Sequence, residues 1–163
     1  MQITKPDKKD LEAMLDIYNY EVEHGVATFD LYPKSMEAWE DWFAAHNVDN
    51  HPLLIARIDG EVAGYASLSA YRERAAYSGT VELSVYISPA FRGCGVATAL
   101  MERILQDARE DERTHAVVSV ITTGNEVSAH LHQKFGFTFC GTLPEVGKKF
   151  GRYLGVDHYL LKV

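Results

Sequence analysis

The chain has 163 residues and a formal net charge of −7, because 23 Asp and Glu outnumber 16 Lys and Arg. This acidic balance argues against nucleic acid and anionic membrane surfaces as partners, since both select a clustered basic face. Hydrophobic residues make up 47% of the chain, enough for the core of one domain over residues 1–163, yet no apolar run approaches the roughly 20 residues that would span a bilayer.

Hydrophobic periodicity predicts alternating strands and helices along this chain. Helices are assigned where apolar residues recur three or four positions apart behind a capping residue, and strands where a short apolar or alternating run is bounded by turn residues. In chain order this predicts a strand before Pro6, helices at 7–24 and 35–43, hairpin strands at 53–58 and 62–68, a polar loop at 71–79, a strand at 81–87, a helix at 97–108, a strand at 116–121, a helix at 125–135, and strands at 137–143 and 153–161. A glycine- and lysine-rich link, residues 145–151, joins the last two strands. This order predicts an α/β (α+β) domain with a mixed sheet flanked by helices.

The stretch from Val81 to Ala97 combines a strand, a glycine-bearing turn and a helix start. Odd-numbered apolar residues of the strand are predicted to point one way, and Glu82, Ser84 and Tyr86 the other. The turn, Arg92-Gly93-Cys94-Gly95, leaves bare backbone at the start of the helix, where free amide groups and the helix dipole favour an anion. The turn is neither a Walker A loop nor a dinucleotide fingerprint. It predicts a phosphate or pyrophosphate site, and the alternative is a strand-to-helix connection without a ligand.

The pattern Arg-x-x-Gly-x-Ala at Arg92, Gly95 and Ala97 resembles the acyl-CoA pyrophosphate loop of the GNAT superfamily of N-acetyltransferases. Residues 124–137 resemble its late helix, and residues 80–87 and 146–154 are similar to the phosphinothricin N-acetyltransferase branch, which includes enzymes that acetylate methionine sulfone and methionine sulfoximine. The resemblance spans essentially the whole chain. It implies a mostly antiparallel sheet splayed at the acyl-CoA site, acetyl-CoA as co-substrate, a small amino acid as acceptor and a homodimer.

The same resemblance implies which residues hold acetyl-CoA. Backbone groups of the central strand would pair with the pantetheine arm, the amides of the turn and helix start would hold the pyrophosphate, and an asparagine side chain would bond the pantetheine. The cofactor-binding residues expected on this basis are Val85, Tyr86, Ile87, Arg92, Gly93, Cys94, Gly95, Val96, Ala97, Thr98 and Asn125. Cys94 would act through its backbone, and Asn125 would also serve as a helix cap.

Acetyl transfer to an amine needs a base, and Glu82 is the candidate. It lies on the polar side of the central strand, where partial burial raises the pKa of a carboxyl group. The resemblance implies the same role. The alternatives are a solvated residue of the strand face and an ammonium-binding residue that moves no proton.

His132 is the candidate proton donor for the leaving thiolate. Many superfamily members carry Leu-Tyr at the late helix, whereas this chain carries Leu131-His132. A histidine can donate a proton near neutral pH, and the alternative is a packed or capping histidine. His130 and His132 do not form a metal site, because positions two apart on a helix diverge.

The loop before the central strand supplies candidate substrate contacts. The resemblance implies contacts from Arg72, Glu73 and Arg74 and from Glu82, Leu83 and Ser84. A guanidinium group suits a carboxylate or phosphinate, and the alternative is a solvated loop. If an arginine binds the α-carboxylate while Glu82 faces the α-amine, the acceptor is a free amino acid. Two competing functions are acetylation of a protein N-terminus or lysine and a non-catalytic acyl-CoA-binding module.

The two cysteines, Cys94 and Cys140, show no metal or redox spacing, and the start of the chain has no signal-peptide pattern. We therefore expect no metal site and a cytoplasmic protein with reduced thiols.

Overall fold

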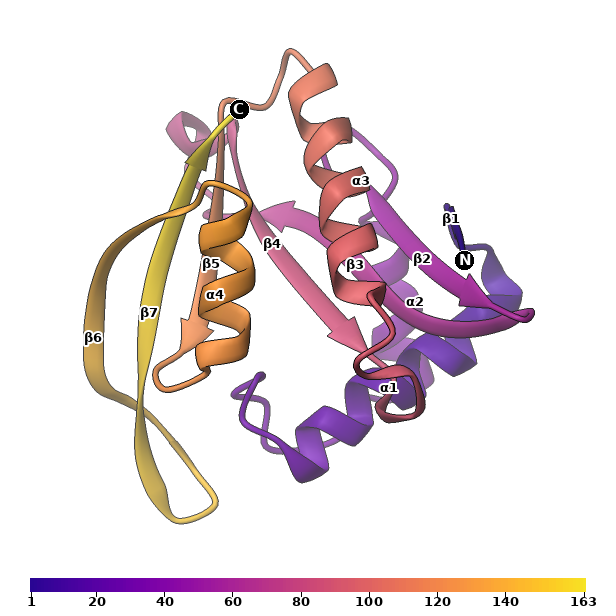
Figure 1. Cartoon of the computed structure of the whole chain (residues 1–163), viewed down its shortest axis with the longest axis horizontal. Coiled ribbons are helices and arrows are strands. Elements are labelled where there is room, and N and C mark those ends of the chain that lie inside the picture. Colours follow the sequence, from indigo (N-terminus) through magenta and orange to yellow (C-terminus); the bar gives the residue numbers. More distant parts are fainter.

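The structure, a computed structural model that describes residues 1–163, contains one seven-stranded sheet with helices on both faces (Figure 1). Its strands lie in the order β1-β2-β3-β4-β5-β7-β6, and every neighbouring pair is antiparallel except β4 and β5. The elements are β1 (Gln2–Thr4), α1 (Leu11–His24), α2 (Met36–Ala44), β2 (Leu53–Ile58), β3 (Glu61–Ala70), β4 (Thr80–Ile87), α3 (Val96–Glu110), β5 (Ala116–Thr122), α4 (Glu126–Lys134), β6 (Thr138–Lys149) and β7 (Arg152–Lys162). This confirms the predicted mixed, mostly antiparallel sheet. None of the helices has the length and apolar character that crossing a membrane would require.

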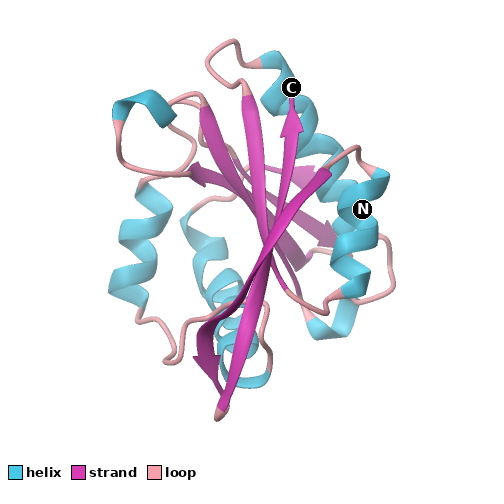
Figure 2. Ribbon diagram, turned by 90° about the vertical axis from the view of Figure 1, so that its left-hand side faces the viewer, coloured by secondary structure: helices cyan, strands magenta, loops and turns pink.

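Two separate cores cover the two faces of the sheet, and Figure 2 shows the helices on either side of it. The larger core packs α3 against β2 to β5, with buried residues such as Leu100, Met101 and Ile104. The smaller core packs α1 and α2 on the other face, around Trp39 and Tyr65. Neighbouring residues of β2 point into different cores, because successive side chains of a strand face opposite ways.

The sheet opens between β4 and β5. These parallel strands share only three register pairs, the last of which joins Glu82 to Val118. Beyond that pair, the strands diverge toward their carboxyl ends, as Figure 1 shows. This is the predicted splay of the sheet.

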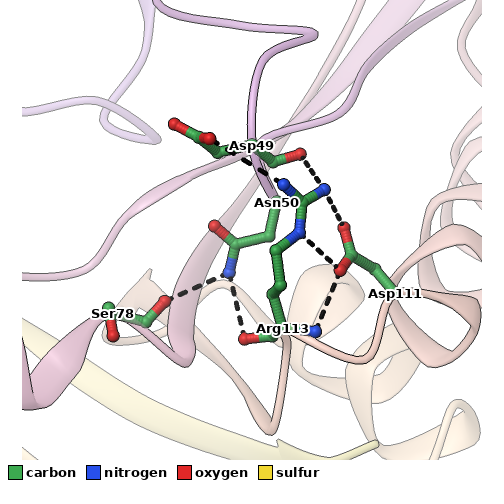
Figure 3. Close-up of polar contacts among 5 residues, drawn as sticks. All are labelled: Asp49, Asn50, Ser78, Asp111 and Arg113. Carbon is green, nitrogen blue, oxygen red and sulfur yellow. Dashed lines mark hydrogen bonds and ion pairs between the residues drawn. The ribbon is translucent and has the colours of Figure 1, made fainter.

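The paired ends of β4 and β5 are fixed by a polar clasp of Asn50 and Arg113 (Figure 3). The buried Asn50 donates its side-chain amide to the Ser78 carbonyl over 3.1 Å, and Arg113 donates to the Asp49 carbonyl over 2.7 Å and to the Asp111 carboxylate over 2.8 Å. The clasp ties together three segments: the one that leads into β2, the one that leads into β4 and the one that leads into β5. The strands therefore start together at this end and separate at the other.

Three local predictions differ from the structure. Asp7 caps a short 3₁₀ turn, Lys8–Asp10, and α1 begins only at Leu11. Tyr86, expected on a polar face, packs its ring against Tyr18 and Tyr65 in the smaller core. Most of the predicted link at 145–151 belongs to β6, which runs to Lys149 with an irregular register between Leu143 and Gly147.

Candidate active site

The turn before α3 has the geometry of an anion-binding loop. Gly93 and Gly95 adopt φ values of 76° and 78°, in the left-handed region that favours glycine. A Cβ at either position would meet no atom within 4 Å, so backbone conformation and not lack of space selects glycine here. Gly95 stands at the start of α3, no side chain caps the helix, and its first turn carries no acidic residue. The first amide groups of α3 are therefore free to bind an anion.

A cleft of about 710 Å³ runs from this turn, along the end of β4, to α4. Eleven of the twelve residues predicted to act in cofactor binding or as the proton donor line it: Val85, Tyr86, Ile87, Arg92, Gly93, Gly95, Val96, Ala97, Thr98, Asn125 and His132. The twelfth, Cys94, is exposed and does not line the cleft. Asn125 caps α4 by accepting from the Ser128 amide over 3.2 Å, which leaves its side-chain nitrogen available to a ligand.

A second, smaller hollow of about 100 Å³ lies where β4 and β5 separate. Leu83 and Ser84 of β4 form one wall, and Ser119 to Thr122 of β5 form the other. Tyr86, Asn125 and His132 line both hollows, so the large cleft leads directly into the small one.

Glu82 lies on the face of the sheet that α1 and α2 cover. Its register partners are Ser69 on β3 and Val118 on β5, at the last pair before the strands diverge. Burial raises the pKa of Glu82, and the nearby His158 on β7 partly offsets this effect. A carboxyl group with a raised pKa, at the edge of the opening, is suited to accept a proton.

The opening between β4 and β5 connects the two faces of the sheet. Glu82 shares its face with Tyr86, which packs against α1, whereas Ser119 faces α4 and contacts His132. The large cleft lies on the α3 and α4 side. A thioester entering along that cleft and an amine approaching Glu82 from the other side would therefore meet at the opening.

His132 is buried and fully hydrogen bonded. Its Nδ1 lies 2.7 Å from the Ser128 carbonyl oxygen and its Nε2 lies 2.7 Å from the Ser119 hydroxyl. Burial lowers the pKa of His132, although the bond to the Ser128 carbonyl opposes this effect. These contacts favour the packed alternative over the proton donor.

The loop between β3 and β4, residues 71–79, carries Arg72 and Arg74 and lines neither hollow. Arg72, Glu73 and Arg74 are exposed, and the Arg72 guanidinium lies 5.2 Å and 5.8 Å from the ring centres of Tyr71 and Tyr77. The loop starts after Ala70, which pairs with Val81, next to Glu82. It therefore leads into the paired end of β4, shortly before Glu82, and no hydrogen bond or ion pair joins Arg72 or Arg74 to Glu82.

Residues 26–30 close the opening from the α1 side. The sequence predicts a loop here, with Phe29 either as a wall of the acceptor pocket or as a core residue, but it does not predict the contacts that follow. Ala27 lines both hollows. The Val26 carbonyl accepts from the Thr122 hydroxyl over 2.6 Å, and the Thr28 carbonyl accepts from Nζ of the buried Lys149 over 2.9 Å. These contacts join the segment to β5 and to the tip of the β6–β7 hairpin.

Ser119 was also missed, although the sequence carries a signal for it. It interrupts the apolar run of 116–121, and a polar side chain in a buried strand requires a hydrogen-bond partner. No comparable signal identifies Lys149 or His158, whose neighbours are distant in sequence. Nowhere do three or more His, Cys, Asp or Glu side chains gather closely enough to hold a metal ion.

Comparison with known proteins gives consistent matches. A family model described as Acetyltransferase (GNAT) family matches residues 13–137. The phosphinothricin N-acetyltransferase of Streptomyces coelicolor is 37% identical over 98% of this chain and 94% of its own length. The L-methionine sulfoximine/L-methionine sulfone acetyltransferase of Salmonella typhimurium is 34% identical over 100% of this chain and 95% of its own length.

Solved structures match over the full chain as well. A ribosomal-protein-alanine N-acetyltransferase from Brucella melitensis superposes with a TM-score of 0.96 at 35% identity, covering 100% of both chains. A GNAT superfamily phosphinothricin acetyltransferase from Sinorhizobium meliloti, in complex with acetyl-CoA, superposes with a TM-score of 0.94 at 30% identity, covering 99% of this chain and 88% of that one.

Proposed function

Because this chain belongs to the GNAT family of acetyltransferases, we propose that it transfers the acetyl group of acetyl-CoA to the α-amine of a small amino acid or analogue. Phosphinothricin, methionine sulfone and methionine sulfoximine define the type of acceptor, as the names of its relatives suggest. The domain would comprise residues 1–163, in keeping with the single sheet formed by β1 to β7.

The observation that carries this proposal is the position of Glu82 at the opening of the sheet. The free amides at the start of α3 fit a pyrophosphate, and the cleft leads from them to the point where the β4–β5 pairing ends. Glu82 stands at that point on the opposite face. A non-catalytic acyl-CoA-binding module would have no need of a partly buried carboxyl group there.

In the proposed reaction, Glu82 accepts a proton from the α-ammonium group, and the free amine then attacks the thioester carbonyl. Main-chain groups of Val85, Tyr86 and Ile87 would orient the pantetheine, and one amide would polarise the carbonyl. Arg72 or Arg74 would bind the α-carboxylate through charge-assisted hydrogen bonds.

A homodimer is part of the proposal. The β6–β7 hairpin carries five large apolar residues that are at least half exposed: Phe139, Leu143, Val146, Phe150 and Tyr153. An exposed apolar surface of this kind suits contact with a partner chain, and the partner that we propose is a second copy of the same chain. We further propose a cytoplasmic location, because both exposed cysteines, Cys94 and Cys140, are free thiols.

The decisive experiment follows thiol release from acetyl-CoA with a panel of acceptors. Methionine sulfone, methionine sulfoximine and phosphinothricin should react, whereas peptides with a free N-terminus or a lysine should not. Turnover with peptides alone would favour the competing function, acetylation of proteins. Binding of acetyl-CoA without turnover for any amine would favour the non-catalytic module.

A further inference from the structure

Ser119 lies at the junction where the two strands separate. It is the first residue of β5 beyond the last pair, Glu82 with Val118, and it lines the small hollow. Its side chain faces α4 and is only 3% exposed. In the proposed reaction the thioester enters from this face. For an amine on the Glu82 side to attack the thioester carbonyl carbon, the thioester sulfur must lie on the α4 side of the opening. Ser119 is next to that position.

The hydrogen bonds of His132 fix the direction of the Ser119 hydroxyl. A carbonyl oxygen only accepts, so Nδ1, which lies 2.7 Å from the Ser128 carbonyl, carries the ring proton. In the neutral ring Nε2 then has no proton and accepts from the Ser119 hydroxyl over 2.7 Å. The Ser119 hydroxyl thus points its proton at Nε2 of His132, and the lone pairs of the Ser119 oxygen remain free.

The surroundings of His132 do not favour a positive charge on it. The rings of Phe137 and Tyr159 pack against it with centres at 5.0 Å and 6.0 Å, and its polar contacts are uncharged: the Ser128 carbonyl and the hydroxyls of Ser119 and Ser128. No carboxylate contacts the imidazole. An imidazole that stays neutral is a poor source of a proton for a leaving group. A thiol is far more acidic than an alcohol, with a pKa of about 8.5 in a cysteine side chain, so the sulfur of CoA can leave as a thiolate if a hydrogen bond stabilises it.

We propose that the Ser119 hydroxyl is the hydrogen-bond donor to the leaving sulfur, and that His132 is a positioning residue that holds this hydroxyl in place. The inference rests on the proposed function. As the carbon–sulfur bond breaks, its electron pair stays on sulfur, and the hydroxyl turns from Nε2 toward the growing charge because a charged acceptor forms the stronger bond. The O–H bond of Ser119 does not break. The α-ammonium group loses two protons on becoming an amide: Glu82 takes the first before attack, and water takes the second as the tetrahedral intermediate collapses. The thiolate takes a proton from water when it leaves.

Binding of CoA alone tests this step without any amine. The ionisation of the bound thiol is followed by the ultraviolet absorbance of the thiolate during a pH titration, in the wild type and in Ser119→Ala. Loss of a hydrogen bond to the thiolate should raise the apparent pKa of the bound thiol by about one to two. Ser119→Thr, which keeps the hydroxyl, should restore the wild-type value. An unchanged thiol pKa in Ser119→Ala with CoA bound would overturn the proposal.

Kinetics separate the roles of the two residues. Ser119→Ala should lower kcat by about tenfold to a hundredfold while the KM for acetyl-CoA changes little. His132→Gln offers Ser119 a side-chain oxygen as acceptor, so it should keep most of the turnover and the shape of the pH profile of kcat. Collapse of kcat together with loss of a basic limb in His132→Gln would make His132 the acid and reject the proposal.

Two controls keep the outcome clear. Should Ser119→Ala not fold, Ser119→Cys takes its place, because it keeps the volume and is only a weak donor. If the wild type failed to bind CoA, the proposed function itself would fall, and this inference with it. A wild type that binds CoA and acetylates amines, with a Ser119→Ala variant of unchanged thiol pKa, would reject the inference alone.

Discussion

Glu82 occupies a position where its negative charge lowers the stability of the fold. Burial raises the pKa of its carboxyl group above the value in the unfolded chain. Such a group stabilises the folded protein while it is protonated, at pH values below the unfolded pKa, and this contribution is lost as the pH rises through the folded pKa. Above this raised pKa, Glu82 is ionised at a cost to stability, and a function for the ionised form would explain why it is there.

Glu82→Gln should separate stability from activity. Without the base, turnover should fall by about 10²- to 10⁴-fold while acetyl-CoA still binds. The melting temperature at pH 7 should rise, because a neutral amide replaces a partly buried charge, and the gain should vanish at low pH. Steady-state kinetics, isothermal titration and thermal unfolding at two pH values measure these effects. Glu40→Gln, at an exposed position of α2, is the matched control. Unchanged turnover would remove Glu82 as the base.

The pH dependence of kcat/KM in the wild-type enzyme should report the ionisation of Glu82. As the pH falls through the raised pKa of Glu82, the base becomes protonated and kcat/KM for the amine should decline. A decline that persists unchanged in Glu82→Gln would assign that limb to another group.

Arg72 tests whether the acceptor is a free amino acid. Arg72→Ala should raise the KM for the amino acid about tenfold to a hundredfold, because it removes charge-assisted hydrogen bonds to the α-carboxylate. The KM for acetyl-CoA should not change, since the loop lines neither hollow. Arg109→Ala on α3 controls for the lost charge. An unaffected amino-acid KM would mean that the carboxylate is bound elsewhere.

At the scale of elements, local signals identified the parts of the site that depend on local backbone. Gly93 and Gly95 mark the turn because their φ values near 77° are unfavourable for other residues. The apolar run of β5 and the stripe of α3 were predicted for the same reason, since their periodicity is local. The resemblance to a known family added the roles of the individual residues.

Features that depend on distant neighbours were not predictable in this way. Residues 147–149 have weak strand propensity, yet pairing with β7 makes them part of β6. Tyr86 alternates with polar residues but meets Tyr18 and Tyr65, which come from other elements. The bond from Lys149 to Thr28 joins residues 121 positions apart, so no window of sequence contains both.

The contact between the hairpin and the segment 26–30 depends on Gly147. A Cβ at this position would lie 2.3 Å from Cε2 of Phe29, so the rigid ring would have to move. Gly147→Ala should therefore destabilise the protein by about 1–3 kcal/mol through overpacking. Because Ala27 lines both hollows, turnover should fall as well.

Denaturant unfolding and kinetics of two variants measure this effect. Gly79→Ala is the control, because its Cβ would meet its nearest atoms at 3.6 Å, an ordinary contact. Adding Phe29→Leu to Gly147→Ala should recover part of the stability. If Gly147→Ala were as stable as Gly79→Ala, the hairpin would not be held by this contact.

At the scale of the whole molecule, the β6–β7 hairpin carries exposed apolar side chains that packing within this chain does not bury. Its turn, Phe150-Gly151, has φ values of 51° and 74°, the left-handed pair typical of a type I′ hairpin turn. Asn or Asp is the preferred first residue there, whereas Phe is unfavourable. Phe150 is nevertheless 59% exposed, so neither the turn nor the core accounts for it. In the proposed dimer, a partner surface would cover the Phe150 ring.

This mismatch provides a test of the proposed dimer that should leave the hairpin folded. Phe150→Asp places a preferred residue in the turn, and Tyr153→Glu replaces an exposed ring with a charge of opposite sign to that of Lys148, its register partner. If the hairpin forms the interface, sedimentation should give a mass of twice 18.3 kDa for the wild type and 18.3 kDa for the double variant. Val48→Asp, which charges an exposed apolar residue outside the hairpin, should leave the mass unchanged. A double variant that remains dimeric would place the interface on another surface, and a monomeric wild type would remove the dimer from the proposal.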